Sequence, residues 1–123
     1  MKFADQLAAA LQWKVSGKTA YGTLGGYAFC VFRDPSYAAH ITAWAVHPGG
    51  LASAVMSDFY AVQRKRFSLY GKPQVFESSV SIQINSVFGS AKAATVCRLL
   101  PVLAAHLAET GFVDACSACS DVH

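Results

Sequence analysis

Two cysteines and a histidine near the C-terminus have the types and spacing of metal ligands. Cys116 and Cys119 are separated by two residues, and His123 follows four residues later. In a Cys-x-x-Cys pair the chain turns tightly, so that both sulfurs reach one zinc ion. A structural zinc site needs four ligands, and the sequence holds no second pair of this kind. The tail therefore predicts one edge of a zinc site, with Cys97 and His106 as candidate fourth ligands.

Three interpretations of this tail stay open. A redox pair is expected at a helix N-terminus, where the thiol pKa is lowered, whereas this pair follows a helix and a short connector. A zinc site formed within the chain, or shared across a dimer, needs ligands from another segment or subunit. The favoured interpretation is that the tail supplies one half of a zinc site. CSAC resembles the first knuckle of a bacterial zinc ribbon, which implies a longer parent protein that continues into the ribbon. The resemblance covers four residues and names no family for the rest of the chain.

A second pair that could do chemistry is Cys30 and His40, which flank the turn over residues 34–36. In a Cys/His dyad the histidine activates the thiol as a nucleophile. Nothing in the sequence nearby supplies an oxyanion hole or an orienting acid, and cysteine is among the most often buried residues. We therefore expect a structural Cys30, and a cysteine or metal enzyme is the less favoured alternative.

The acidic residues and the glycines suggest no other catalytic site. The seven Asp and Glu residues show no spacing that implies a shared acid–base pair. The glycines at 22, 25 and 26 could suggest a phosphate-binding loop, but no helix opens directly after them. We interpret them as turn residues and predict that the chain is not an enzyme.

The composition indicates one domain with apolar surface left for a partner. Of the 123 residues, 54% are hydrophobic and 14% are charged, whereas about 25% is the usual charged fraction. Apolar surface on a small domain promotes association. We expect a homodimer, with another protein as the alternative partner.

Neither nucleic acid nor a membrane is an expected partner. The net charge is +3, and the one basic cluster, residues 64–66, would point in several directions from a helix. No stretch of about 18 apolar residues could span a membrane, and Asp5 and Gln6 interrupt the N-terminal stretch that a signal peptide would need. We expect a cytoplasmic protein.

The spacing of apolar residues predicts a single α+β domain over residues 1–112, followed by a tail over 113–123. Helical periodicity covers residues 3–14, 51–70 and 89–111, and the second helix is expected to end at Gly71 and to bury Val62. Alternation predicts strands at 27–33, 37–46 and 74–88, with a short strand or turn at 19–24. We expect a single antiparallel sheet of three to five strands with two or three helices packed on it.

The strand at 27–33 carries apolar side chains on both faces, so we expect it to be covered on both. Aromatic side chains between sheet and helices could then be plain core or could line an apolar ligand pocket. The pocket candidates are Tyr27, Phe29, Trp44, Phe59 and Tyr60. The favoured function is a non-enzymatic protein-interaction or sensing module that forms a homodimer. A small-molecule-binding domain is the alternative, and no cofactor is expected unless another segment or subunit completes the zinc site.

Overall fold

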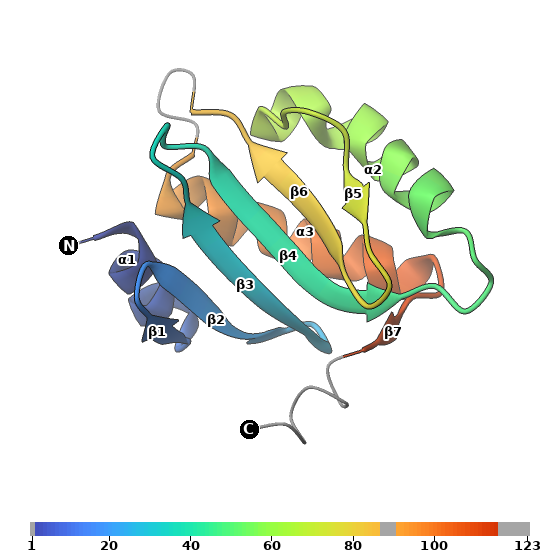
Figure 1. The fold of residues 1–123 in the computed structure, drawn as a ribbon, viewed down its shortest axis with the longest axis horizontal. Helices are drawn as coiled ribbons and strands as arrows, with labels where there is room; N and C mark the ends of the chain where they lie inside the picture. The colour runs from blue at the N-terminus through green and yellow to red at the C-terminus, as the bar shows by residue number, and fades with distance from the viewer. Residues whose placement is uncertain (1, 87–90, 116–123) are drawn as a thin grey trace.

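The computed structural model describes residues 2–86 and 91–115, which form three helices and one antiparallel sheet (Figure 1). The elements in chain order are α1 (Phe3–Leu11), β1 (Lys14–Ser16), β2 (Thr19–Leu24), β3 (Tyr27–Arg33), β4 (Ala39–Val46), α2 (Ala52–Phe67), β5 (Gln74–Val75), β6 (Val80–Ile84), α3 (Ala93–Glu109) and β7 (Val113–Asp114). The predicted α+β class with a single antiparallel sheet is confirmed.

The described sheet has seven strands, so the expected three to five is wrong. The strand order is β1-β2-β3-β4-β6-β5, and β7 pairs with the last two residues of β4. The additional strands β1, β5 and β7 are two or three residues long. A period of two cannot be recognised over so few positions, which is why the sequence did not show them. Because β7 belongs to the sheet, the sheet extends past residue 112.

All three helices lie on one face of the sheet. In Figure 1, α3 crosses behind β3 and β4, α1 lies at the β1–β2 side and α2 at the β5–β6 side. The apolar stripe of α3 faces the sheet and is fully buried. That stripe consists of Val96, Leu99, Leu100, Leu103 and Leu107. On β4, alternate alanines and Ile41 face the helices and give them room to approach.

The strand β3 is covered on one face, not on two as expected. Tyr27, Phe29 and Val31 are buried against the helices, whereas Cys30 is half-buried and Phe32 is exposed on the other side. Three helices with one apolar stripe each are enough to cover a single face of this sheet. The opposite face is left without a layer of its own within the described chain.

The helix α2 ends earlier than predicted. It stops at Phe67, where Ser68 takes the left-handed conformation that ends the helix, and does not continue to Gly71. Leu69 then leaves the helix and forms a β-bridge with Ile84. Val62, which was expected in the buried stripe, is 75% exposed. None of the helices in the described residues is long and apolar enough to cross a membrane.

Candidate functional site

The sheet face opposite the helices is not covered by a helix of the described chain (Figure 1). Cross-strand partners share a face, so the register of β2, β3, β4 and β6 defines its rows. One row runs through Tyr21, Cys30, Thr42 and Ser81. We call this surface the open face. It consists of Thr19, Tyr21, Thr23, Ala28, Cys30, Phe32, His40, Thr42, Trp44, Val46, Ser81 and Gln83.

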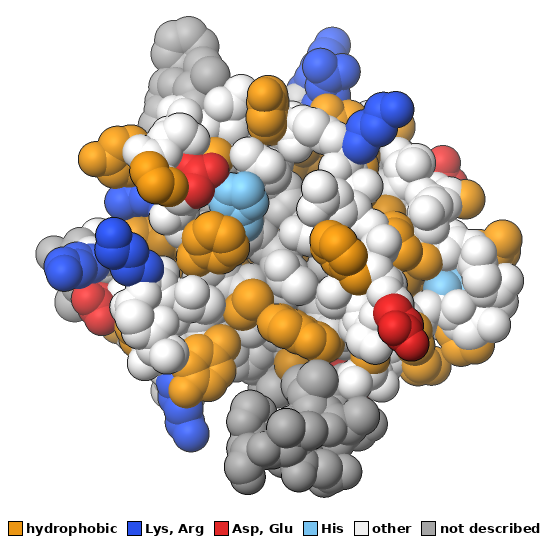
Figure 2. Space-filling model, in the orientation of Figure 1, with side chains coloured by type: hydrophobic (Ala, Val, Ile, Leu, Met, Phe, Trp, Pro, Cys, Tyr) orange, Lys and Arg blue, Asp and Glu red, His pale blue; other side chains and the backbone are white. Residues whose placement is uncertain are grey.

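Over β2, β3, β4 and β6 the open face carries aromatic and small polar side chains without formal charge, and Lys14 of β1, the partner of Tyr21, lies at its edge. None of its twelve positions is Lys, Arg, Asp or Glu. Tyr21 is 41% exposed and Phe32 is 37% exposed, and Trp44 is half-buried. In Figure 2 the central area of this face shows orange and white side chains, while blue side chains lie toward its margin. Depletion of charge together with enrichment in aromatic residues is typical of the core of a protein–protein interface.

Cys30 and His40 both lie on the open face, but the structure does not bring them together as a catalytic dyad. Cys30 is directly opposite Thr42, whereas His40 is opposite Phe32 and binds Asp34. Burial raises the pKa of the Cys30 thiol, and a hydrogen bond with Thr42 offsets part of this effect. The thiolate is the reactive form of cysteine, so this environment works against nucleophilic chemistry at Cys30.

Asp34 organises the turn between β3 and β4 at one corner of the open face. Its Oδ1 accepts hydrogen bonds from the backbone N–H groups of Ser36 and Ala38 and from the Ser36 hydroxyl, at 2.6–3.1 Å. The Nε2 of His40 donates to Oδ2 at 2.7 Å, and the His40 ring stacks on Phe32 with centroids 4.7 Å apart. The hydrogen bond from His40, followed by the one from Ser36, lowers the pKa of Asp34 to about 2.

This lowered pKa predicts an acid sensitivity that depends on Asp34. The carboxyl has a pKa of about 2 in the folded chain against 3.8 without these contacts. Its stabilising contribution is therefore complete above the higher value and is lost as the pH falls from about 4 to about 2. We expect the urea midpoint of the wild type to fall toward that of Asp34→Asn across this window. An Asp58→Asn variant on exposed α2 serves as the control. If the urea midpoints of wild type and Asp34→Asn differ by the same amount at every pH in this window, the lowered pKa of Asp34 is contradicted.

The structure places the five aromatic residues predicted to line a pocket in different surroundings. Tyr27, Phe29 and Phe59 are core residues, and the Tyr27 hydroxyl donates a hydrogen bond to the Phe112 carbonyl. Trp44 lies on the open face. The fifth, Tyr60, is half-buried on α2, where its ring lies 5.8 Å from the guanidinium of Arg64. The first three are thus placed as the plain-core interpretation describes.

The proposed zinc ligands Cys116, Cys119 and His123 lie outside the described residues, so the half-site stays a prediction. The two candidate fourth ligands are on α3. Cys97 is half-buried, and burial raises the pKa of its thiol. The Nε2 of His106 donates a hydrogen bond to the Val55 carbonyl at 3.2 Å. Within residues 2–86 and 91–115, no three His, Cys, Asp or Glu side chains are grouped so that they could hold a metal ion.

No protein-family model, curated protein or solved structure matches the chain. The functional argument therefore depends on the geometry of this molecule. Sequence reasoning missed the open face as a site, although strand 27–33 carried the signal in its two apolar faces. What the sequence could not show was that all three helices pack on the same side.

Proposed function

We propose that this chain is a non-enzymatic protein-interaction module that forms a homodimer by pairing the open faces of two copies. The observation that carries the proposal is the absence of formal charge from all twelve positions of the open face. In a domain with ten Lys or Arg and seven Asp or Glu residues, such a surface at the centre of the sheet favours burial against a partner. The raised pKa of Cys30 and the engagement of His40 by Asp34 support a non-catalytic role.

The open face is large enough for a modest interface. With strands about 4.8 Å apart and a rise of about 3.3 Å per residue, the four strands of five to eight residues cover roughly 400 Å². Two such faces would together cover about 800 Å², the size of a weak or transient protein–protein interface. We therefore expect a dimer with a dissociation constant in the micromolar range rather than an obligate one.

A second copy is the partner that this chemistry fits best. In a two-fold dimer the same patch meets itself, so any charge near the axis faces a like charge. Such juxtapositions cost several kcal/mol, and a neutral face avoids them. The rings and methyl groups of Trp44 and Val46 can pack against their own counterparts, and Lys14, beside Tyr21, stays at the edge of the interface.

The test places one charge at the centre of the open face. Thr42 is half-buried in the middle of β4, and its hydroxyl contacts that of Ser81 at 3.4 Å. We expect the wild type to sediment as a dimer at about 100 µM, and Thr42→Arg to weaken association by about tenfold or more. Sedimentation equilibrium over a concentration series measures both.

The matched control is Val62→Arg, which adds the same charge on the exposed surface of α2. This variant is expected to associate like the wild type, and circular dichroism should show that both variants keep the fold. A wild-type chain that stays monomeric across the series would contradict the homodimer. Equal weakening by Thr42→Arg and Val62→Arg would instead contradict the open face as the interface.

A further inference from the structure

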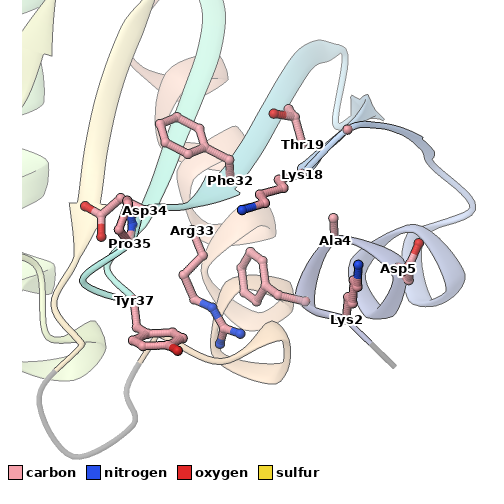
Figure 3. A pocket seen from close by; sticks show the side chains of 12 residues that line it. Lys2, Ala4, Asp5, Lys18, Thr19, Phe32, Arg33, Asp34, Pro35 and Tyr37 are labelled. Atoms are coloured by element: carbon pink, nitrogen blue, oxygen red, sulfur yellow. The ribbon is translucent and has the colours of Figure 1, made fainter.

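A cleft at one corner of the sheet is formed by segments that are far apart in sequence (Figure 3). Its walls are the first turn of α1, the turn between β1 and β2, and the turn between β3 and β4. The volume is about 640 Å³, within the range of roughly 300–1,000 Å³ that is typical of small-molecule sites. Phe32 lines the cleft and also belongs to the margin of the open face, so the two surfaces are adjacent.

The cleft carries an excess of positive charge that the described chain does not neutralise. Each wall contributes one cation, Lys2, Lys18 or Arg33, and Figure 3 shows all three around the same space. No carboxylate of the described residues forms an ion pair with any of them. Asp34 also lines the cleft, but its oxygens are occupied by its own turn and by His40. Asp34 keeps its negative charge, and Asp5 is the other lining carboxylate, so three cations face two carboxylates and one positive charge is in excess.

Arg33 is held in place before any ligand binds. Its guanidinium carbon lies 4.6 Å from the centroid of the Phe3 ring and 5.3 Å from that of Tyr37. One of its nitrogens donates to the Ala91 carbonyl at 3.4 Å. A guanidinium presents five N–H donors in one plane and binds phosphate or carboxylate with two parallel hydrogen bonds. Fixing this group in advance reduces the entropy that a ligand must overcome.

Two backbone features of the cleft are typical of a site that binds an anionic ligand. Tyr37 has φ 67°, a left-handed conformation that is unfavourable for an aromatic residue, and the residue is 65% exposed with its ring beside Arg33. Strained residues of this kind are often found at ligand sites. No side chain caps the N-terminus of α1 at Lys2, and the dipole of a helix favours a negative group at this end.

We propose that the cleft binds a small molecule in which an aromatic ring carries a phosphate or carboxylate group. Arg33 and Lys18 bind the anionic group, and the exposed Tyr37 ring beside Arg33 packs against the body of the ligand. This site goes beyond the interaction function, because Thr42 and Trp44 at the centre of the open face do not line the cleft.

The test is an NMR titration of the ¹⁵N-labelled full chain with defined probes. Phenyl phosphate and phenylacetate supply the two anionic groups on a ring, benzyl alcohol supplies the ring alone, and inorganic phosphate supplies the anion alone. We expect saturable shifts at residues 17–19 and 33–37 with phenyl phosphate or phenylacetate, with dissociation constants of about 0.1–10 mM. The tighter of these two probes identifies the anionic group that the cleft prefers.

Two variants and a control assign the binding. Lys18→Gln is expected to weaken it about twofold to fivefold, and Arg33→Gln about tenfold or more. Arg33 packs between two rings, so Arg33→Gln also removes contacts that stabilise the fold. Lys18 lies on an exposed turn, so the effect of Lys18→Gln on binding is independent of folding. Lys72→Gln removes a charge elsewhere on the surface and should leave binding unchanged.

Several results would overturn the proposal. These are the absence of saturable shifts, binding of benzyl alcohol or inorganic phosphate as tight as that of phenyl phosphate, or equal effects of Lys18→Gln and Lys72→Gln. Repeating the titration on Thr42→Arg separates the two proposals. Loss of dimerisation in this variant should leave the cleft and its affinity unchanged.

Discussion

Replacement of Phe29 with alanine is expected to lower the free energy of unfolding by about 3–5 kcal/mol, the cost typical of removing a buried aromatic ring. Phe29 lies in the middle of β3 and is 1% exposed. Its cross-strand partners are Gly22 and Ala43, and the Trp13 ring stacks on it with centroids 6.3 Å apart. Because glycine and alanine cannot extend into the space, the cavity would persist and the loss should approach the upper value.

The matched control is Phe32→Ala, three residues along the same strand and on the other face. Phe32 is exposed, and its main ring contact is the stack on His40, so we expect a loss of about 0.5–1 kcal/mol. Urea denaturation at one fixed, low protein concentration measures both variants, since association would make the stability depend on concentration. Similar losses for the two variants would contradict the one-sided burial of β3.

The comparison of these two phenylalanines also shows how far the sequence could predict the fold. Periodicity identified the three helices, the buried stripe of α3 and the alternation of β4, because each is a local property of the chain. It could not assign Phe29 to the core and Phe32 to the surface. That assignment depends on which face of the sheet the helices pack against, and the apolar pattern of β3 is compatible with packing on either face.

The candidate sites were predictable to a lesser degree. Low charge indicated a surface for association, but the open face exists only because the register of four strands aligns their neutral positions. The cleft was not foreseen, since Lys2, Lys18 and Arg33 come from three separate segments and have no motif in common. The aromatic residues expected around a pocket were chosen for their type alone, and type does not distinguish a core residue from a ligand contact.

Replacement of Gly22 with alanine is expected to destabilise the chain by about 1–3 kcal/mol through overpacking. Gly22 was interpreted as a turn residue, but it lies within β2 and faces the helices, whereas Gly25 and Gly26 do form the turn that follows. A Cβ at position 22 would lie 2.2–2.6 Å from atoms of the Trp13 ring. The ring would have to move, although it stacks on Phe29 and its Nε1 donates to the Thr23 carbonyl at 3.1 Å.

A double-mutant cycle with Trp13→Leu separates this steric effect from a general intolerance of side chains in β2. In the Trp13→Leu background the indole is gone, so Gly22→Ala should become neutral or stabilise by about 0.5–1 kcal/mol, because glycine is unfavourable within a strand. Thr23→Ala, at the next and exposed position of β2, should change stability by no more than about 0.5 kcal/mol. Urea denaturation of the four members of the cycle gives the coupling energy directly. If Gly22→Ala costs the same with and without the tryptophan, the contact between Gly22 and Trp13 does not explain why glycine is needed there.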